Sequence, residues 1–222
     1  MLKISNLTKS YRQRGVVLDN LDLEISEGET VSITGPSGSG KTTLLNIIGL
    51  LDKPENGTIL FRGSNILDYG QDDSAFYRNR NIGFVFQDHL LLPYLTVKEN
   101  ILLPLIPSKL DDKEYGERLK YADELMKHTG IRDLAGKYPY GISVGEAQRT
   151  ALVRALINKP HLLLADEPTG ALDKKNAENL GDLLLKMNRD YRIGLLIVTH
   201  SAELAEKMGT RLKLNEGKLL PS

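Results

Sequence analysis

A glycine-rich stretch of eight residues, Gly35-Pro-Ser-Gly-Ser-Gly-Lys-Thr42, restricts the possible folds of this chain more than any other feature. It fits the pattern G-x-x-x-x-G-K-S/T, whose glycines let the backbone turn tightly and approach phosphate oxygens closely. An alternating apolar run, Glu29–Thr34, precedes the stretch, and a helix-compatible run, Thr42–Leu51, follows it. A strand, a phosphate loop and a helix in this order predict an anion site at the helix N-terminus.

The residues of this phosphate loop have separate predicted roles. Lys41 would neutralise the β- and γ-phosphates of a nucleotide, and the Thr42 hydroxyl would ligate Mg²⁺. The duller interpretation is a glycine-rich turn with a solvated lysine, which the flanking strand and helix disfavour. The predicted phosphate-binding set is Gly35, Pro36, Ser37, Gly38, Ser39, Gly40, Lys41, Thr42 and Thr43.

Composition excludes several classes of protein. The 222 residues suffice for one sizeable domain, and 29 basic residues balance 29 acidic ones, so no basic surplus indicates nucleic acid. Cysteine is absent, which excludes a disulfide framework and a thiolate metal site. The first ten residues lack the apolar core of a signal peptide, and no run approaches the ~20 apolar residues of a membrane span. Any role at a membrane therefore requires a partner.

Strand patterns and helix patterns alternate along most of the chain. Leu21, Leu23 and Ile25 alternate with polar residues, and together with Leu2–Leu7 and Gly57–Gly63 they predict an antiparallel β region near the start. Further buried strands are expected at Ile82–Phe86, His161–Ala165 and Ile193–Val198, with a helix at Lys174–Arg189 and a C-terminal hairpin over Asn215–Gly217. This order predicts an α/β fold with a mostly parallel sheet covered by helices on both faces.

The segment from about Pro93 to Asn158 has a different character and predicts a helical insert. Asp111–Glu114 opens one helix, and a second helix follows Ser143. In the first helix, the spacing predicts one buried face that carries Tyr115, Leu119, Ala122 and Met126.

Two acids follow the predicted strand His161–Ala165. The carboxyl end of a strand beside a phosphate loop is where an open α/β sheet binds ligand. Asp166 would hold Mg²⁺ through water, and Glu167 could polarise an attacking water. Alone, the pair would be read as a polar turn before Pro168. Together with the phosphate loop, it predicts nucleotide hydrolysis.

Five further elements stand in the order found in ABC-type ATPases, and the chain resembles that family from Leu2 to about Lys218. They are Tyr11 at the adenine-stacking position, Gln87 at the Q-loop, Ile142-Ser-Val-Gly-Glu-Ala-Gln-Arg149 at the signature motif, Asp173 in the D-loop and His200 at the switch histidine. Singly, each has a plainer interpretation. Ser143-x-x-Glu146, for example, is also a helix capping box that needs no ligand.

The resemblance implies a fold and a division of the chain. The fold would be that of a P-loop NTPase (RecA-like), with an N-terminal antiparallel β subdomain and a helical insert. Residues 1–222 would form a single ABC ATPase domain. Within it, residues 1–92 and 159–222 would form the ATP-binding core with the β subdomain, and about 93–158 would form the helical subdomain with the signature motif.

The resemblance also implies cofactors and a mechanism. ATP and Mg²⁺ would be the ligands, and two copies would pair head to tail. Ser143, Gly145 and Glu146 of one copy would then contact nucleotide held by the other. The implied catalytic residues are Lys41, Gln87, Glu167 and His200, and the implied metal-binding residues are Thr42, Gln87 and Asp166.

One position departs from the family pattern L-S-G-G-Q. Val144 occupies the slot of the first glycine, and a β-branched side chain there restricts the backbone and fills space near the nucleotide. We therefore expect slow hydrolysis, with turnover raised by Val144→Gly and ATP affinity of the monomer unchanged.

Several stretches are similar to the macrolide-exporter and lipoprotein-release branch of the family, among them Ile48–Pro54, Arg80–Gln87 and Leu91–Thr96. This implies a peripheral ATPase at the cytoplasmic face of the plasma (inner) membrane. It would drive a separate permease that docks near Phe84–Tyr94. Two alternatives stay open: a non-transport, ATP-gated module with weak hydrolysis, and another kind of P-loop NTPase.

Overall fold

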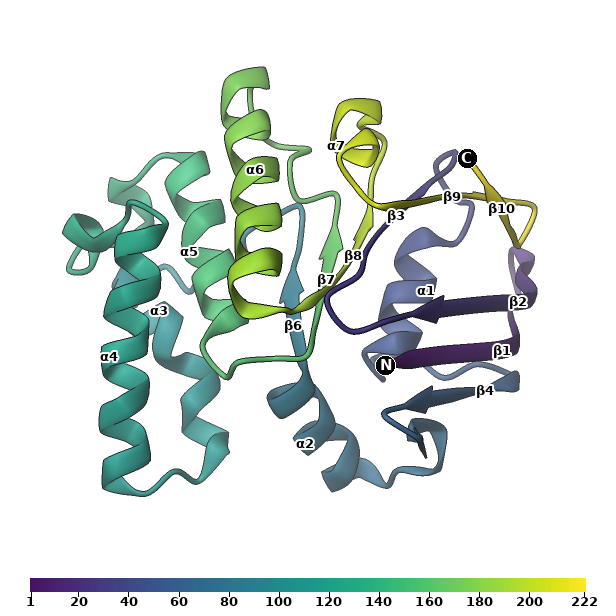
Figure 1. Cartoon of the computed structure of the whole chain (residues 1–222), viewed down its shortest axis with the longest axis horizontal. Helices are drawn as coiled ribbons and strands as arrows, with labels where there is room; N and C mark the ends of the chain where they lie inside the picture. Colours follow the sequence, from purple (N-terminus) through teal and green to yellow (C-terminus); the bar gives the residue numbers. More distant parts are fainter.

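Two sheets organise the chain, and the computed structural model describes all residues from 1 to 222 (Figure 1). The first sheet is antiparallel and has the strand order β2-β1-β4-β5. Residues Leu21, Leu23 and Ile25 of β2 are buried and alternate with exposed residues, as the sequence predicts. The strands are β1 (Leu2–Tyr11), β2 (Gly15–Ile25), β4 (Asn56–Phe61) and β5 (Ser64–Asn65).

The second sheet has six strands in the order β10-β9-β3-β8-β7-β6. All neighbours in it are parallel except β9 and β10, which form the predicted C-terminal hairpin with Asn215 opposite Lys218. The predicted mostly parallel sheet is therefore confirmed. The strands are β3 (Thr30–Thr34), β6 (Ile82–Val85), β7 (Leu162–Asp166), β8 (Gly194–Val198), β9 (Thr210–Asn215) and β10 (Lys218–Pro221).

Helices cover both faces of the parallel sheet. In Figure 1, α1 lies between this sheet and the antiparallel one, while α4, α5 and α6 lie on the other side. The helices are α1 (Lys41–Ile48), α2 (Gln71–Asn81), α3 (Val97–Leu102), α4 (Asp112–His128), α5 (Val144–Leu156), α6 (Lys174–Tyr191) and α7 (Ala202–Glu206). Short 3₁₀ helices stand at Ile66–Asp68, Leu103–Ser108, Arg132–Leu134 and Pro139–Gly141.

The alternation of residues along the central strands divides the interior into two cores. Leu162 and Leu164 of β7 pack with α1 and the antiparallel sheet, whereas Leu163 and Ala165 pack with the helical side. Successive side chains of a strand point to opposite faces, so one apolar strand serves both cores. Each core contains 23 buried residues. Because the sheet is packed on both faces, the ends of its strands are held in a fixed position beside α1.

The buried face of α4 differs from the predicted one. Ala122 and Met126 are buried as expected, but Tyr115 is 43% exposed, and Tyr121 and Leu125 are buried as well. Only the second half of α4 packs against the core, and there the buried stripe is wider than the predicted one, because it also takes in Tyr121 and Leu125. Tyr121 meets Tyr191 of α6 edge to face, with ring centroids 5.8 Å apart. The first turns are charged and face solvent.

None of the helices combines the length and the apolar character that crossing a membrane requires.

Candidate active site

The phosphate loop connects the end of β3 to the first turn of α1. Gly40 precedes the helix with a left-handed φ of 103°, and no side chain caps the helix N-terminus. A side chain at Gly35 is excluded, because its Cβ would lie 2.4 Å from the carbonyl oxygen of Leu214 in β9. The first turn of α1 thus presents backbone N–H groups that no cap occupies, which is the arrangement that binds anions.

The side chain of Lys41 folds back over this loop. Its Nζ donates to the carbonyl oxygens of Gly35 at 2.9 Å and Pro36 at 3.1 Å. Burial lowers the pKa of Lys41, and the nearby carboxylates of Glu167 and Asp166 oppose that shift. An ammonium held among carbonyl oxygens in a desolvated loop is one that a phosphate would stabilise.

Thr42 and Asp166 meet although they come from different elements. Asp166 ends β7, and Thr42 lies in the first turn of α1. Burial raises the pKa of Asp166, while a hydrogen bond from the Thr42 hydroxyl acts in the opposite direction. The contact places a hydroxyl and a carboxylate side by side, and oxygen donors of this kind suit Mg²⁺.

Glu167 follows Asp166 in the left-handed conformation, with a φ of 46°. Its Oε2 accepts from the backbone N–H of His200 at 3.0 Å and from the Thr199 hydroxyl at 3.2 Å. Its Oε1 is buried and has no hydrogen-bond partner. A strained backbone that aims an unpaired carboxylate oxygen into a site is typical of functional residues, and the free oxygen suits a water to be polarised.

His200 completes this group. Its Nε2 lies 3.3 Å from Lys41 Nζ and 3.5 Å from Glu167 Oε1. The contact with the lysine ammonium would use Nε2 as an acceptor, whereas the contact with the carboxylate would use it as a donor, so the tautomer of His200 decides which of the two forms. Lys41, Glu167 and His200 therefore lie together at the phosphate loop.

Tyr11 and Gln87 lie at the margins of the group. The Tyr11 hydroxyl is 3.5 Å from Thr43 Oγ1 in the first turn of α1. The Gln87 side chain is exposed and lies against Gly170, whose added Cβ would stand 3.2 Å from Gln87 Cδ. Gly170 belongs to the turn that follows Glu167, since its N–H donates to the Glu167 carbonyl oxygen at 2.9 Å. Gln87 thus lies beside the turn that carries the acid.

The signature residues are not brought to the phosphate loop. Ser143 is the N-cap of α5, and the parallel sheet stands between α5 and α1 (Figure 1). Ser143 and Glu146 form a full capping box, with Ser143 N–H and Oγ donating to Glu146 Oε2 at 2.7 and 2.9 Å. Gly145 is buried near Asn176, which Asp173 caps at the start of α6. The signature and D-loop residues therefore adjoin each other.

Sequence reasoning missed two residues of α5 that bind the neighbouring loops. Gln148 is buried and donates through Nε2 to the carbonyl oxygens of Phe86 at 2.6 Å and Pro168 at 2.9 Å. Arg154 donates to those of His89 and Leu90, both at 2.7 Å. The available signal was a glutamine and an arginine among the apolar residues of a helix that packs against the core, because buried polar groups require partners.

Comparison with known proteins identifies the family. The family model described as "ABC transporter" matches residues 18–170, which is more than half of the chain. This chain belongs to the ABC transporter family. Membership confirms the resemblance that the sequence indicated and makes the chain an ATP-binding transporter subunit and an ATPase.

Several named relatives match almost the whole chain. It is 43% identical to the lipoprotein-releasing system ATP-binding protein LolD 1 of Rhodopirellula baltica, covering 99% of this chain and 96% of that protein. It is 42% identical to the ABC transporter ATP-binding protein YknY of Bacillus subtilis, covering 100% and 96%. LolD of Syntrophus aciditrophicus is 40% identical, with 99% of both chains covered. The predicted similarity to the lipoprotein-release branch is confirmed.

Solved structures agree with the fold. The dimeric structure of MJ0796, a bacterial ABC transporter cassette, superposes with a TM-score of 0.89 at 41% identity, covering 99% of this chain and 96% of that one. A dimeric post-hydrolysis state of the MJ0796 cassette with ADP and Pi gives a TM-score of 0.86 at 40% identity, with the same coverage. The P-loop NTPase fold predicted from the sequence is therefore confirmed.

Proposed function

We propose that this chain powers an exporter of the lipoprotein-release and macrolide type, in which two copies pair head to tail on ATP and drive a separate permease. The observation that carries the proposal is the convergence of Lys41, Asp166, Glu167 and His200 around the uncapped N-terminus of α1. The names of the LolD relatives support the branch, and the dimeric cassettes support the pairing.

Within one copy, the residues divide the work of hydrolysis. The loop amides and Lys41 would hold the phosphates of ATP, with Tyr11 beside the base. Thr42 and Asp166 would hold Mg²⁺ with Gln87 nearby, and the ion would supply charge neutralisation at the phosphates. Glu167, through its unpaired Oε1, would polarise the attacking water while Lys41 and His200 stabilise the developing charge.

A second copy would complete the site. Ser143, Gly145 and Glu146 stand apart from the phosphate loop of their own chain, so their predicted contact with nucleotide requires another chain. In a two-fold symmetric pair, each contact from the first copy to the second also occurs from the second to the first. Each signature helix would therefore lie over the phosphate loop of the partner. Loss of the γ-phosphate would remove the bridge between the copies, and this opening would move the permease.

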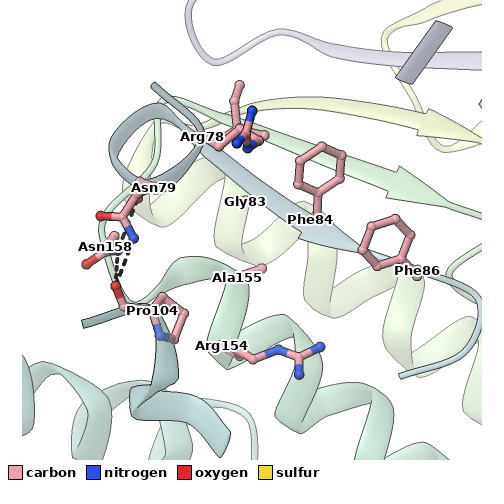
Figure 2. Close-up of a pocket in the computed structure, with 10 residues that line it drawn as sticks. Arg78, Asn79, Gly83, Phe84, Phe86, Pro104, Arg154, Ala155 and Asn158 are labelled. Carbon is pink, nitrogen blue, oxygen red and sulfur yellow. Dashed lines mark hydrogen bonds between the residues drawn. The ribbon is translucent and has the colours of Figure 1, made fainter. Parts of the chain in front are cut away.

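A groove between β6 and α5 supports the predicted permease docking surface (Figure 2). It has a volume of about 260 Å³, and the parallel rings of Phe84 and Phe86 line it with centroids 5.3 Å apart. The adjoining segment exposes large apolar side chains, with Leu90 57%, Leu92 48% and Tyr94 90% exposed. Exposed apolar residues gathered beside a groove mark an interaction site, and a cytoplasmic helix of the permease fits it. Such docking would hold the chain peripherally at the cytoplasmic face of the membrane.

The test measures ATP binding, ATP-dependent pairing and phosphate release for the unaltered chain and for Lys41→Ala. We expect Lys41→Ala to lose all three, while Lys113→Ala, which removes an exposed lysine from the first turn of α4, keeps them. Nucleotide binding and normal pairing by Lys41→Ala would overturn the proposal.

The same assay separates the alternatives. Strong preference for GTP would indicate a different P-loop enzyme. ATP-dependent pairing without phosphate release, even with the permease present, would favour a non-catalytic gating module. Co-purification with a membrane protein encoded beside this chain, lost when Phe84 and Tyr94 become charged, would support the docking surface.

A further inference from the structure

A charged cluster holds the Tyr11 side chain in place. The Tyr11 hydroxyl donates to Asp52 Oδ2 at 2.6 Å, and Lys9 Nζ donates to Asp52 Oδ1 at 2.7 Å. The same ammonium also donates to the Lys53 carbonyl oxygen at 2.7 Å. The side chains of Lys9 and Asp52 are only 12% and 29% exposed. Hydrogen bonds to a carboxylate are short and strong, and partial burial reduces their screening.

Asp52 is itself attached to the helix that begins at the phosphate loop. The backbone N–H groups of Leu51 and Asp52 donate to the Asn46 carbonyl oxygen in α1, at 2.8 and 3.3 Å. The Tyr11 hydroxyl also lies 3.5 Å from Thr43 Oγ1, in the first turn of the same helix. The phenol of β1 is therefore tied to α1 at two points, which fixes its place relative to the phosphate loop.

The cluster also makes the two faces of the Tyr11 ring different. Lys9 Nζ lies 4.9 Å from the ring centroid, so a cation covers one face. The opposite face is then the one on which a base can stack. Burial alone would raise the pKa of Asp52, but the hydrogen bonds from Lys9 and Tyr11 outweigh it and keep the pKa below its ordinary value. The acceptor of the tyrosine hydroxyl is therefore ionised at neutral pH.

We propose that Asp52 and Lys9 are positioning residues that hold the Tyr11 ring where a purine base stacks on it, and that they act on the base and not on the phosphates. This rests on the proposed function, because it assumes a nucleotide on the phosphate loop. A tyrosine that is free to rotate would have to be ordered by each incoming base. The apparent affinity for ATP then falls in proportion to the fraction of molecules whose ring is correctly placed.

The experiment compares Mg-ATP with Mg-tripolyphosphate, which has the phosphates but no base. Binding is measured by calorimetry for the unaltered chain, Asp52→Ala, Tyr11→Phe and the double variant. We expect each single change to weaken ATP binding by about tenfold or more, as loss of one hydrogen bond to a charged group would. Tripolyphosphate binding should be unchanged.

Two further readouts distinguish positioning from a general structural role. The double variant should be no weaker than Asp52→Ala alone, because Tyr11→Phe removes a bond that Asp52→Ala has already removed. In turnover assays, KM for ATP should rise with kcat unchanged, and Asp52→Asn, which keeps an acceptor, should recover part of the affinity. Asp182→Ala is the control, since it removes another lysine–aspartate pair, between α6 and Lys207, away from Tyr11.

An unchanged ATP affinity in Asp52→Ala, or an equal loss of tripolyphosphate binding, would overturn the inference. If Asp52→Ala does not fold, Lys9→Met keeps the apolar stem without the charge, and the same two ligands decide the matter. Failure of the proposed function has another signature, because the unaltered chain would then bind neither ligand.

Discussion

The N-termini of α1 and α5 are both expected to face phosphate, yet they are built in opposite ways. At α1, Gly40 gives no side-chain cap, and Ser39 Oγ in the loop before it is buried without a partner. At α5, the carboxylate of Glu146 accepts both the backbone N–H and the hydroxyl of Ser143. One N-terminus is open, and the other is occupied by an anion of its own chain.

This difference shows that helix polarity alone does not make a phosphate site. The hydrogen bonds from Ser143 lower the pKa of Glu146, so a full negative charge already neutralises the positive end of α5. A γ-phosphate approaching from a second copy would meet like charge there. We infer that α1 is ready for nucleotide in the single chain, whereas α5 contributes only after the capping box rearranges.

Mixing two inactive variants gives the strongest test of the idea that α1 of one copy and α5 of the other form one site. Lys41→Ala damages the phosphate loop of one chain, and Ser143→Ala damages the signature motif of the other. Each variant alone should turn over ATP at least about a hundredfold more slowly than the unaltered chain. A mixed pair retains one site with an intact loop and an intact signature. Because Lys41→Ala does not pair with itself on ATP, activity should come from mixed pairs, each of which holds one good site of two, so at most about half of the active sites should be restored.

The measurement is phosphate release at constant total protein as the mixing ratio is varied. Activity should peak at equal amounts and vanish at either end. Two different loop variants, Lys41→Ala and Lys41→Met, serve as the control mixture and should remain inactive together. A flat profile in the first mixture would mean that loop and signature serve the same chain.

Removing the charge at Glu146 tests the occupied N-terminus. Glu146→Gln keeps the capping geometry, since glutamine also forms the box, but removes the anion that opposes phosphate. We expect turnover and ATP-dependent pairing to increase by about fivefold, the effect of relieving one partly screened like-charge contact. Single-turnover phosphate release and sedimentation with ATP would measure both.

A matched control lies in α4. There, Asp111 and Glu114 form the same capping box away from the nucleotide residues, so Glu114→Gln should leave turnover unchanged. Equal responses from the two variants would assign the effect to helix capping. A fall in turnover with Glu146→Gln would show that the carboxylate assists the reaction.

Val144 offers a smaller effect at the same N-terminus. It is the first residue of α5 and is 52% exposed, so its side chain stands where the partner's nucleotide would approach. Val144→Gly should raise turnover by about twofold or threefold without changing the ATP affinity of the monomer, and should lower stability by about 0.5–1 kcal/mol. Val144→Ala separates bulk from backbone freedom. Unchanged kcat in both variants would show that this departure from the family pattern is harmless.

The sequence predicted the two regions unequally, and the reason is physical. The phosphate loop, Asp166 and Glu167 follow from local order, because a strand must end where its loop begins and parallel strands end at one edge. The state of Ser143 was ambiguous, because S-x-x-E is equally a cap and part of a signature. The face of α4 was misplaced at Tyr115, because periodicity does not tell how far along a helix its neighbours extend. The roles of Gln148 and Arg154 could not be predicted, because the loops that they bind are distant in the sequence and come together only in the fold.

The smallest expected effect is on the pH dependence of thermal stability, where Glu146 at α5 and Asp166 beside α1 should act in opposite directions. The pKa of Glu146 is lowered in the folded chain, so its ionised form stabilises the fold above the ordinary pKa of glutamate, and that stability is lost as pH falls through the folded value. Burial raises the pKa of Asp166 in the folded chain. The ionised carboxylate therefore destabilises the ligand-free fold above that raised value, and in acid, where the group is protonated, this destabilisation is absent.

At pH 7, Asp166→Asn should therefore raise Tm and Glu146→Gln should lower it, each by about 1–2 °C. Both differences should shrink as pH falls, and the Glu146 difference should disappear only below its lowered folded pKa, where the carboxyl groups are protonated in folded and unfolded chains alike. Calorimetric scans without nucleotide would measure this, and shifts of the same sign in the two variants would contradict the opposition between an open and an occupied N-terminus.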